Sequence, residues 1–287
     1  MKILVTGGTG FVGRYLVEEL SKEHQLVLPT RDIKKAELLF SGRGNLDNIK
    51  IIHFQEDLDH TVRKYRPEVI INLLGILYEN RKKGITFEKV HFEYTKKLVD
   101  AASDIGIKLF VQMSALGADP SSKSRYQRTK GVAEEYIRSS NINYIIHRPS
   151  IIMGREQKLF QDMKKFGKIM PLFLAPEGRV QPVHILDVRD CFLKSLDEED
   201  EIFELCGDRV VTFKELFEFA LKYAGYRRPV IQMPKIFFRF MLPFFKLLPE
   251  PPMTEDQYYM LQKDNVCSGK YRGVKELLGK IRNPFEF

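Results

Sequence analysis

Short apolar runs alternate with amphipathic stretches along the first half of the chain. The apolar runs lie at 2–7, 25–31, 49–55, 68–75 and 108–115. They are continuous and show no strict alternation, which is typical of strands buried on both faces of a parallel sheet. The amphipathic stretches at 11–22 and 87–106 predict helices between strands. The pattern therefore predicts an α/β protein with a doubly wound parallel sheet, the Rossmann fold, and right-handed crossovers.

A glycine-rich loop, TGGTGFVG at 6–13, follows the first predicted strand and opens the first predicted helix. Gly7 permits a tight turn, Gly10 lets backbone N–H groups approach a pyrophosphate, and Gly13 lets helix and strand pack closely. The helix N-terminus then faces the phosphate charge. This order of strand, loop and helix predicts a dinucleotide site, although a tight turn without a ligand remains the alternative. The predicted contacts are Gly7, Thr9, Gly10, Phe11, Val12 and Gly13.

The end of the second predicted strand bears on the choice between NAD and NADP. A carboxylate there would bind the ribose of NAD, but the sequence reads Pro29-Thr30-Arg31-Asp32, with Lys35 nearby. A guanidinium binds a 2′-phosphate through paired, charge-assisted hydrogen bonds. Arg31 and Lys35 therefore favour NADP, whereas Asp32, shifted by one position, would favour NAD.

Three residues further along form a candidate reactive group. Tyr126 and Lys130 are four residues apart on one predicted helix face, and Ser114 lies at the end of the predicted strand KLFVQMS at 108–114. The unperturbed pKa of a tyrosine is about 10, so a phenolate near neutrality needs a shift of roughly three units, part of which the Lys130 ammonium would supply. Ser114 would lie at the carboxyl edge of the sheet, where its hydroxyl could hold a substrate oxygen. Taken alone, a tyrosine and lysine at this spacing are common on helix surfaces.

These features together resemble the short-chain dehydrogenase/reductase superfamily, in its extended and atypical branches. The resemblance covers most of the chain and implies that Ser114, Tyr126 and Lys130 are the catalytic residues, with Tyr126 and Lys130 also near the cofactor. The segment HRPSIIMG at 147–154 resembles the stretch approaching the nicotinamide. The remaining implied cofactor contacts are Asp57 and Leu58 at the adenine, Leu74 and Gly75 after the fourth strand, and Pro149.

Within the superfamily, the segments at 114–137, 182–188, 251–257 and 264–266 look most like one particular group. It contains the nucleotide-binding accessory subunit of mitochondrial respiratory complex I and bacterial NAD-dependent epimerase/dehydratase-like proteins. The resemblance to this group also implies that NADP(H) can be held as a structural element. The presence of Ser114, Tyr126 and Lys130 therefore does not establish turnover. The chain also departs from the common pattern at His91, which either joins a proton relay or is a packed, hydrogen-bonded core residue.

From about Met153 the alternation of strands and helices weakens, and proline and phenylalanine become more frequent. We therefore expect a Rossmann domain at 1–152 and a smaller α+β substrate or lid domain at 153–287, some of whose segments return to the sheet. The stretch 235–249 carries five phenylalanines with basic residues between them. It is expected either to pack as a lid or to contact a membrane surface or a respiratory complex.

Composition narrows the function classes further. Hydrophobic residues make up 44% and charged residues 29% of 287, a balance typical of a soluble globular protein. The net charge of +8 is scattered and lacks an aromatic-basic motif, so nucleic acid is not an expected partner. Cys191, Cys206 and Cys267 show no paired spacing; reduced, buried thiols are expected, with no disulfide framework and no metal site. Without a leader or membrane span, the expected location is cytoplasmic, or peripheral to the inner face of a membrane.

Two functions follow from these observations. The first is an NADP-dependent, or NAD-dependent, oxidoreductase or epimerase acting on a small-molecule carbonyl or hydroxyl group. The second is a catalytically silent NADP(H)-binding accessory or sensor protein of a membrane-associated redox complex.

Overall fold

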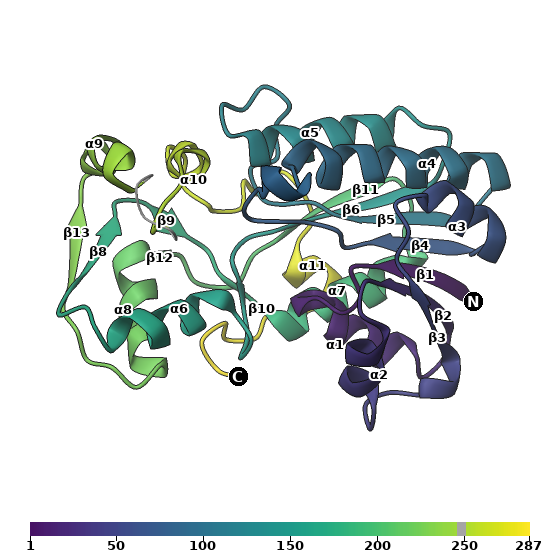
Figure 1. Cartoon of the computed structure of the whole chain (residues 1–287), viewed down its shortest axis with the longest axis horizontal. Coiled ribbons are helices and arrows are strands. Elements are labelled where there is room, and N and C mark those ends of the chain that lie inside the picture. Colours follow the sequence, from purple (N-terminus) through teal and green to yellow (C-terminus); the bar gives the residue numbers. More distant parts are fainter. Residues whose placement is uncertain (246–250) are drawn as a thin grey trace.

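The computed structural model describes residues 1–245 and 251–287, and its centre is a seven-stranded parallel sheet (Figure 1). The strand order is β11-β6-β5-β4-β1-β2-β3. The predicted doubly wound parallel sheet is confirmed. Its strands are β1 (Lys2–Thr6), β2 (Gln25–Thr30), β3 (Ile49–His53), β4 (Val69–Asn72), β5 (Leu109–Met113), β6 (Tyr144–Pro149) and β11 (Glu201–Leu205).

The sheet order reverses at β1, which pairs with β2 on one side and with β4 on the other. Its register joins Ile3 to Val69 and Thr6 to Asn72, so the two strands end side by side. In open α/β sheets, ligands bind in the crevice outside the carboxyl ends of the strands at such a switch point. If this sheet follows that rule, a ligand is expected directly after Thr6 and Asn72.

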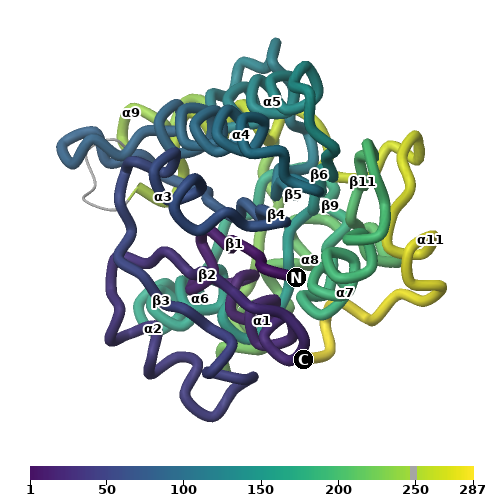
Figure 2. The backbone as a smooth tube through the Cα atoms, turned by 90° about the vertical axis from the view of Figure 1, so that its right-hand side faces the viewer, coloured from purple at the N-terminus to yellow at the C-terminus, as the bar shows by residue number. Residues whose placement is uncertain are grey.

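Helices cover both faces of the sheet, and each face has its own apolar core. Figure 2 shows these layers from the side. One core packs Leu16, Val17 and Phe192 against the sheet; the other packs Val62 and Leu98 against the opposite face. The helices of the first face are α1 (Phe11–Leu20), α2 (Ile33–Phe40), α7 (Ile185–Lys194) and α11 (Val274–Leu278), and those of the second are α3 (Leu58–Tyr65), α4 (Tyr94–Ile105) and α5 (Arg125–Arg138).

A smaller α+β unit lies beyond the carboxyl ends of the strands, on the left of Figure 1. Two apolar clusters hold it together, one around Phe160, Leu216 and Val230 and one around Phe238 and Tyr258. Its helices are α6 (Lys158–Gly167), α8 (Phe213–Tyr223), α9 (Lys235–Phe245) and α10 (Glu255–Met260). The short strands after β6 are β7 (Ile152–Met153), β8 (Phe173–Pro176), β9 (Arg179–Val180), β10 (Val183–His184), β12 (Val211–Thr212) and β13 (Val230–Met233).

Segments from the second half of the chain also belong to the sheet layer. β11 pairs in parallel with β6, and α7 and α11 pack together below the sheet. Single turns complete the described structure: η1 (Leu46–Asn48), η2 (Arg81–Lys83) and η4 (Ser195–Asp197) are 3-10 helices, and η3 (Glu88–Glu93) is a π-helical turn. The boundary between residues 152 and 153 stays a prediction.

The expectation that all cysteines are reduced is wrong for two of the three. Cys206 and Cys267 form a disulfide, with their Cα atoms 6.1 Å apart, whereas Cys191 is a free, buried thiol. The two partners are 61 residues apart in sequence. The fold brings them together because the residue after β11 lies against the segment that returns from α10. No spacing rule in the sequence could indicate this contact.

No helix in the described residues has the length and apolar character needed to cross a lipid bilayer.

Candidate cofactor and active site

The glycine loop turns sharply between β1 and α1. Gly7 has a φ of +70°, in the left-handed region that favours glycine, and a Cβ atom there would lie 3.0 Å from the backbone of Leu73. The N–H of Gly10 donates to the carbonyl of Gly7 at 2.9 Å. A Cβ on Gly13 would come within 2.5 Å of the Gly7 carbonyl oxygen, so helix and loop pack too closely for any side chain there. The roles expected of Gly7 and Gly13 in shaping the loop match this geometry.

The N-terminus of α1 is open for an anion. No side chain caps the helix at Gly10, and its first turn holds no acidic residue. The N–H groups of the first turn of any helix lack partners within the helix and carry a partial positive charge. Gly10 is exposed and Thr9 and Phe11 are half-buried, whereas the Val12 side chain is in the core. The donor set of this turn therefore fits the pyrophosphate of a dinucleotide.

At the end of β2, the Asp32 side chain has a hydrogen-bond partner within the described part of the chain and the Arg31 side chain has none. The Asp32 carboxylate accepts the Lys35 N–H at 3.0 Å and thereby caps α2. The Arg31 and Lys35 side chains are exposed, and among the described residues Arg31 has no hydrogen bond or ion pair. At this strand end Arg31 is therefore the side chain left free for a ligand, while Asp32 is committed to the helix.

The next two predicted contacts occupy different environments. Asp57 caps α3 by accepting the His60 N–H at 3.1 Å, and the Leu58 side chain is fully buried, so Leu58 offers a ligand only its backbone. Beyond β4, Leu74 is half-buried and Gly75 is exposed. Pro149 ends β6 as a buried residue.

Lys130 lies directly under the exposed Gly75. Its ammonium donates to the carbonyl of Met113 at 2.9 Å and to that of Leu74 at 3.4 Å, joining the ends of β5 and β4. A Cβ on Gly75 would be 3.5 Å from the Lys130 Nζ, so a side chain at position 75 would lie over the ammonium, which is itself buried. Burial lowers the pKa of Lys130 to about 8. The ammonium is therefore mostly protonated at neutral pH and available as a donor.

Tyr126 lies one helical turn before Lys130, at the start of α5. Its ring packs edge-on against Phe87 and His91, with ring centres 5.7 and 5.1 Å apart. Burial, followed by the nearby Asp256 carboxylate, raises the pKa of Tyr126 to about 12. The sequence-based expectation of a lowered pKa is wrong for this state of the protein, because both of these effects disfavour the phenolate.

Ser114 directly follows β5, at the strand end where the sequence placed it, and is buried. Its hydroxyl donates to the buried carboxylate of Glu134, which also accepts the Arg148 Nε–H at 3.0 Å. The hydroxyl proton of Ser114 is therefore occupied, and only its lone pairs remain for a substrate. Glu134 was not among the predicted site residues, although it follows Tyr126 and Lys130 at four-residue steps on the same helix face.

His91 is a packed, hydrogen-bonded residue. Its Nε2 accepts the Ile76 N–H at 3.1 Å, and its Nδ1 lies 3.0 Å from the Thr129 hydroxyl. Thr129 in turn donates to the Tyr126 carbonyl. Burial, with the Lys130 charge second, lowers the pKa of His91 well below its usual value. Both ring nitrogens of this neutral histidine are engaged, which leaves none for a relay to a substrate.

A buried polar network at the switch point was also missed. The Asn72 amide accepts the Thr6 hydroxyl at 2.6 Å and donates to Gln112 at 2.9 Å and to Thr95 at 3.0 Å. It also accepts the Leu74 N–H at 3.2 Å. The signal in the sequence is a polar residue ending an otherwise apolar strand. This network fixes the ends of three neighbouring strands from which the site is built.

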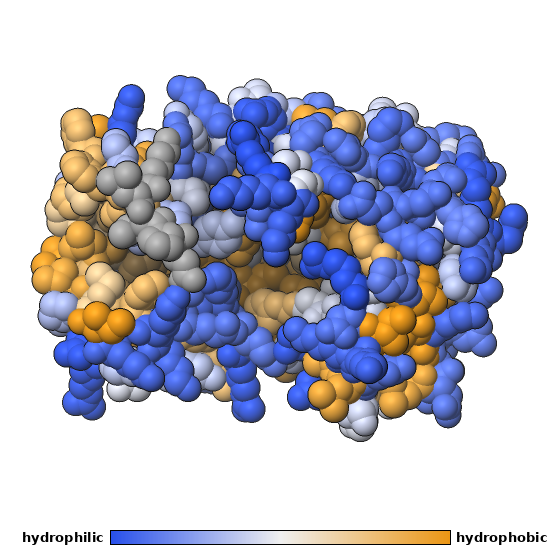
Figure 3. All heavy atoms as spheres, viewed as in Figure 1, coloured by the Kyte–Doolittle hydropathy of each residue, from blue (hydrophilic) through white to orange (hydrophobic). Residues whose placement is uncertain are grey.

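The sheet order separates the site residues into two groups. Arg31 and Asp57 follow β2 and β3 on one side of the glycine loop, whereas Gly75, Ser114 and Lys130 meet at β4 and β5 on the other. This order suits an elongated dinucleotide lying across the carboxyl edge with its pyrophosphate at α1. Figure 3 shows a hollow between the two halves of the molecule on this face.

A separate open pocket of about 890 Å³ lies between α1, the start of α7 and the C-terminal residues. No predicted site residue lines it.

Comparisons with known proteins agree with this geometry. The sequence profile of the NAD dependent epimerase/dehydratase family matches residues 3–204. The mitochondrial NADH dehydrogenase [ubiquinone] 1 alpha subcomplex subunit 9 of Arabidopsis thaliana is 31% identical over 226 residues, which span 75% of this chain but only 56% of that protein. The mitochondrial NADH-ubiquinone oxidoreductase 40 kDa subunit of Neurospora crassa is 28% identical over 286 residues, covering 95% of this chain and 74% of that protein.

Among solved structures, a UDP-glucuronic acid 4-epimerase from Bacillus cereus, in complex with UDP-glucuronic acid and NAD, shares the fold. Its TM-score is 0.69 at 17% identity, covering 97% of this chain and 93% of that chain. The resemblance inferred from the sequence motifs is confirmed. This chain belongs to the NAD dependent epimerase/dehydratase family.

Proposed function

We propose that this protein binds a nicotinamide dinucleotide, NADP in preference to NAD, and acts on a hydroxyl or carbonyl group of a small molecule as an oxidoreductase or epimerase. The observation that carries the proposal is the shared crevice. The open N-terminus of α1 and the Lys130 ammonium under Gly75 lie along one edge of the sheet. Membership of the family supports the same function.

When bound, the nicotinamide would supply or accept the hydride. The roles of the side chains follow from their environments. Tyr126, with a raised pKa, is protonated at neutral pH and suits donation of a proton from its hydroxyl to a substrate oxygen. Lys130 would hold a ribose hydroxyl, and Ser114, whose hydroxyl donates its hydrogen bond to Glu134, would accept a hydrogen bond from the substrate.

The experiment is a turnover assay. Purified protein is mixed with NADPH or NADH and a panel of aldehydes, ketones and nucleotide sugars, and nicotinamide absorbance and sugar stereochemistry are followed. We expect turnover of one substrate class. Cofactor binding without turnover of any class would contradict the enzymatic proposal and favour the second function.

The second candidate is a dinucleotide-loaded accessory or sensor protein that does not turn over. The names of two relatives, both subunits of mitochondrial NADH oxidoreductases, favour it. So does α9, which exposes Phe240 by 71%, Phe244 by 64% and Ile236 by 51% of their surface. Residues 246–249 of the expected contact segment lie outside the described residues.

Arg31→Ala is expected to weaken NADPH binding about 10- to 100-fold and to leave NADH binding unchanged, because only NADPH carries the 2′-phosphate. Calorimetric titration of NADPH and NADH measures both affinities. Lys222→Ala on the distant helix α8 is the control, because it also removes one exposed positive charge. Equal loss for NADH and NADPH would show that Arg31 does not read the 2′-phosphate.

The exposed face of α9 is expected to bind anionic lipid. Its apolar side chains are accompanied by Lys235 and Arg239, and Figure 3 shows apolar residues gathered over this end of the molecule. Phe240→Ser together with Phe244→Ser should abolish co-flotation with vesicles rich in anionic lipid. Leu38→Ser, which removes a 79% exposed leucine on α2, is the control and should float like the wild type. Equal flotation of all three proteins would remove the support for a peripheral membrane role.

A further inference from the structure

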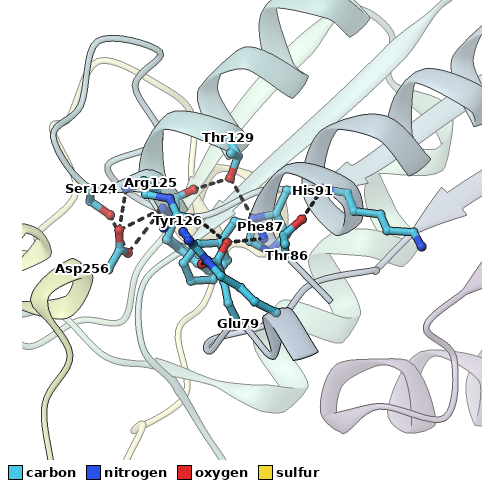
Figure 4. A network of polar contacts seen from close by, with 11 residues as sticks. Glu79, Thr86, Phe87, His91, Ser124, Arg125, Tyr126, Thr129 and Asp256 are labelled. Atoms are coloured by element: carbon cyan, nitrogen blue, oxygen red, sulfur yellow. Dashed lines mark hydrogen bonds and ion pairs between the residues drawn. The ribbon is translucent and has the colours of Figure 1, made fainter. Parts of the chain in front are cut away.

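The N-terminus of the helix that carries Tyr126 is completed by a side chain from the other half of the molecule. Asp256, in α10, accepts the Arg125 N–H at 2.5 Å, the Tyr126 N–H at 3.3 Å and the Ser124 hydroxyl at 2.9 Å (Figure 4). These N–H groups have no partner within α5 because they belong to its first turn. A carboxylate in this position also interacts favourably with the helix dipole.

Asp256 is aimed at α5 by the local structure of its own helix. Thr254 caps α10, and the Gln257 Oε1 accepts the Thr254 N–H at 2.9 Å, forming a capping box. Because Thr254 and Gln257 cap α10, the Asp256 carboxylate is not needed to cap its own helix. Its neighbour Gln257 also reaches across to donate to the Tyr78 hydroxyl at 3.1 Å.

A second set of contacts holds the Tyr126 ring from the opposite side. Arg125 forms an ion pair with Glu79, whose carboxylate also accepts the Phe87 N–H at 3.0 Å. Phe87 then packs against the ring of Tyr126. Figure 4 shows Asp256, Arg125 and Glu79 arranged around Tyr126.

The far end of the segment after α10 is also anchored. The Asp264 carboxylate accepts the Arg179 backbone N–H at 3.0 Å, Asn265 bridges to Val180, and Cys267 is bonded to Cys206. The segment from 251 to 267 is thus tied to the smaller unit and to the sheet, with Asp256 as its contact with α5.

We propose that Asp256 is a positioning residue that joins the smaller unit to α5 and holds Tyr126 at the crevice. We call its hydrogen bonds to Ser124, Arg125 and Tyr126 the latch. This inference rests on the proposed role of Tyr126, but the latch itself can be measured without turnover. The proposal assigns a physical role to two segments that stood out in the sequence. The segment at 251–257 supplies Asp256, and the segment at 264–266 anchors the chain through Asp264.

The latch has an electrostatic consequence, because the Asp256 charge disfavours a phenolate on Tyr126. The titratable and charged groups around Tyr126 are Asp256 from α10, Glu79 from the loop before η2, His91 from η3, and Arg125 and Lys130 from α5. His91 is neutral, and Glu79 is paired with Arg125. Asp256 is therefore the group whose removal should lower the pKa of Tyr126.

Two measurements on the ligand-free protein test the latch. In Asp256→Ala, amide exchange at 254–260 and at Arg125 and Tyr126 should be roughly 10- to 100-fold faster than in the wild type, because hydrogen bonds to a charged group are lost. In Asp256→Asn, which keeps the shape, NMR titration of labelled tyrosines, assigned with Tyr126→Phe, should show Tyr126 ionising at lower pH. Asp47→Asn, an exposed carboxylate on η1, should change neither quantity.

Wild-type exchange rates in Asp256→Ala, or an unchanged Tyr126 titration in Asp256→Asn, would overturn the proposal. If Asp256→Ala does not fold, the titration of Asp256→Asn decides. Suppose that amide exchange is faster in Asp256→Ala and the pKa of Tyr126 is lower in Asp256→Asn, but the wild type turns over no substrate. That result would support the latch and refute the enzymatic function. Turnover that is insensitive to Asp256→Asn, with unchanged exchange and titration, would refute the latch and leave the enzyme standing.

Discussion

Replacing Tyr126 with phenylalanine is expected to lower turnover about 10²- to 10⁴-fold, the usual contribution of a positioned general acid or base. The substitution removes only the hydroxyl. The ring contacts with Phe87 and His91 are edge-on packing interactions that phenylalanine retains. Dinucleotide affinity and thermal stability should therefore stay close to those of the wild type. The substitution should lower kcat and leave cofactor binding unchanged.

The measurement is steady-state kinetics with the substrate found in the panel. Tyr223→Phe, a partly exposed tyrosine on α8 in the smaller unit, serves as the control and should keep full activity. Full activity in Tyr126→Phe would assign the proton transfer to another group and remove the central residue of the proposed site.

Gly10→Glu is expected to weaken dinucleotide binding at least about 100-fold, because like charges brought together at a binding site cost several kcal/mol. Gly10 has a φ of −74°, which any residue adopts, and a Cβ there would meet only the Gly7 carbonyl oxygen, at 3.1 Å. The fold should therefore tolerate the side chain. The carboxylate would occupy the place of the pyrophosphate at the start of α1 and would itself interact favourably with the helix dipole.

The thermal midpoint of ligand-free Gly10→Glu should accordingly equal or slightly exceed that of the wild type. Gly10→Ala adds the Cβ without the charge and should lose far less affinity. If Gly10→Glu binds NADPH as well as the wild type does, the phosphates lie elsewhere.

The Rossmann half could be predicted from sequence because its determinants are local. Continuous apolar runs indicated the buried parallel strands, and the glycine loop carries its constraints in adjacent residues, as the left-handed φ of Gly7 and the tight approach of Gly13 illustrate. Tyr126 and Lys130 were found for the same reason, since a spacing of four residues places them on one face of α5.

The contacts that modify this site could not be predicted, because they join distant parts of the chain. Asp256 meets Tyr126 across 130 residues, and Cys206 meets Cys267 across 61. The direction of the Tyr126 pKa was missed for this reason: its own helix supplies a lysine, but burial and a carboxylate from the smaller unit decide the shift. Ser114 was likewise expected to hold a substrate oxygen through its hydroxyl, whereas that hydroxyl donates its hydrogen bond to Glu134 and keeps only its lone pairs for a substrate.

Calorimetric titration of NADPH and of NADH into the purified wild-type protein tests the central claim most directly. We expect saturable binding of one dinucleotide per chain, tighter for NADPH than for NADH, and lost in Gly10→Glu. Absence of binding for both cofactors, in protein whose thermal unfolding is cooperative, would contradict it.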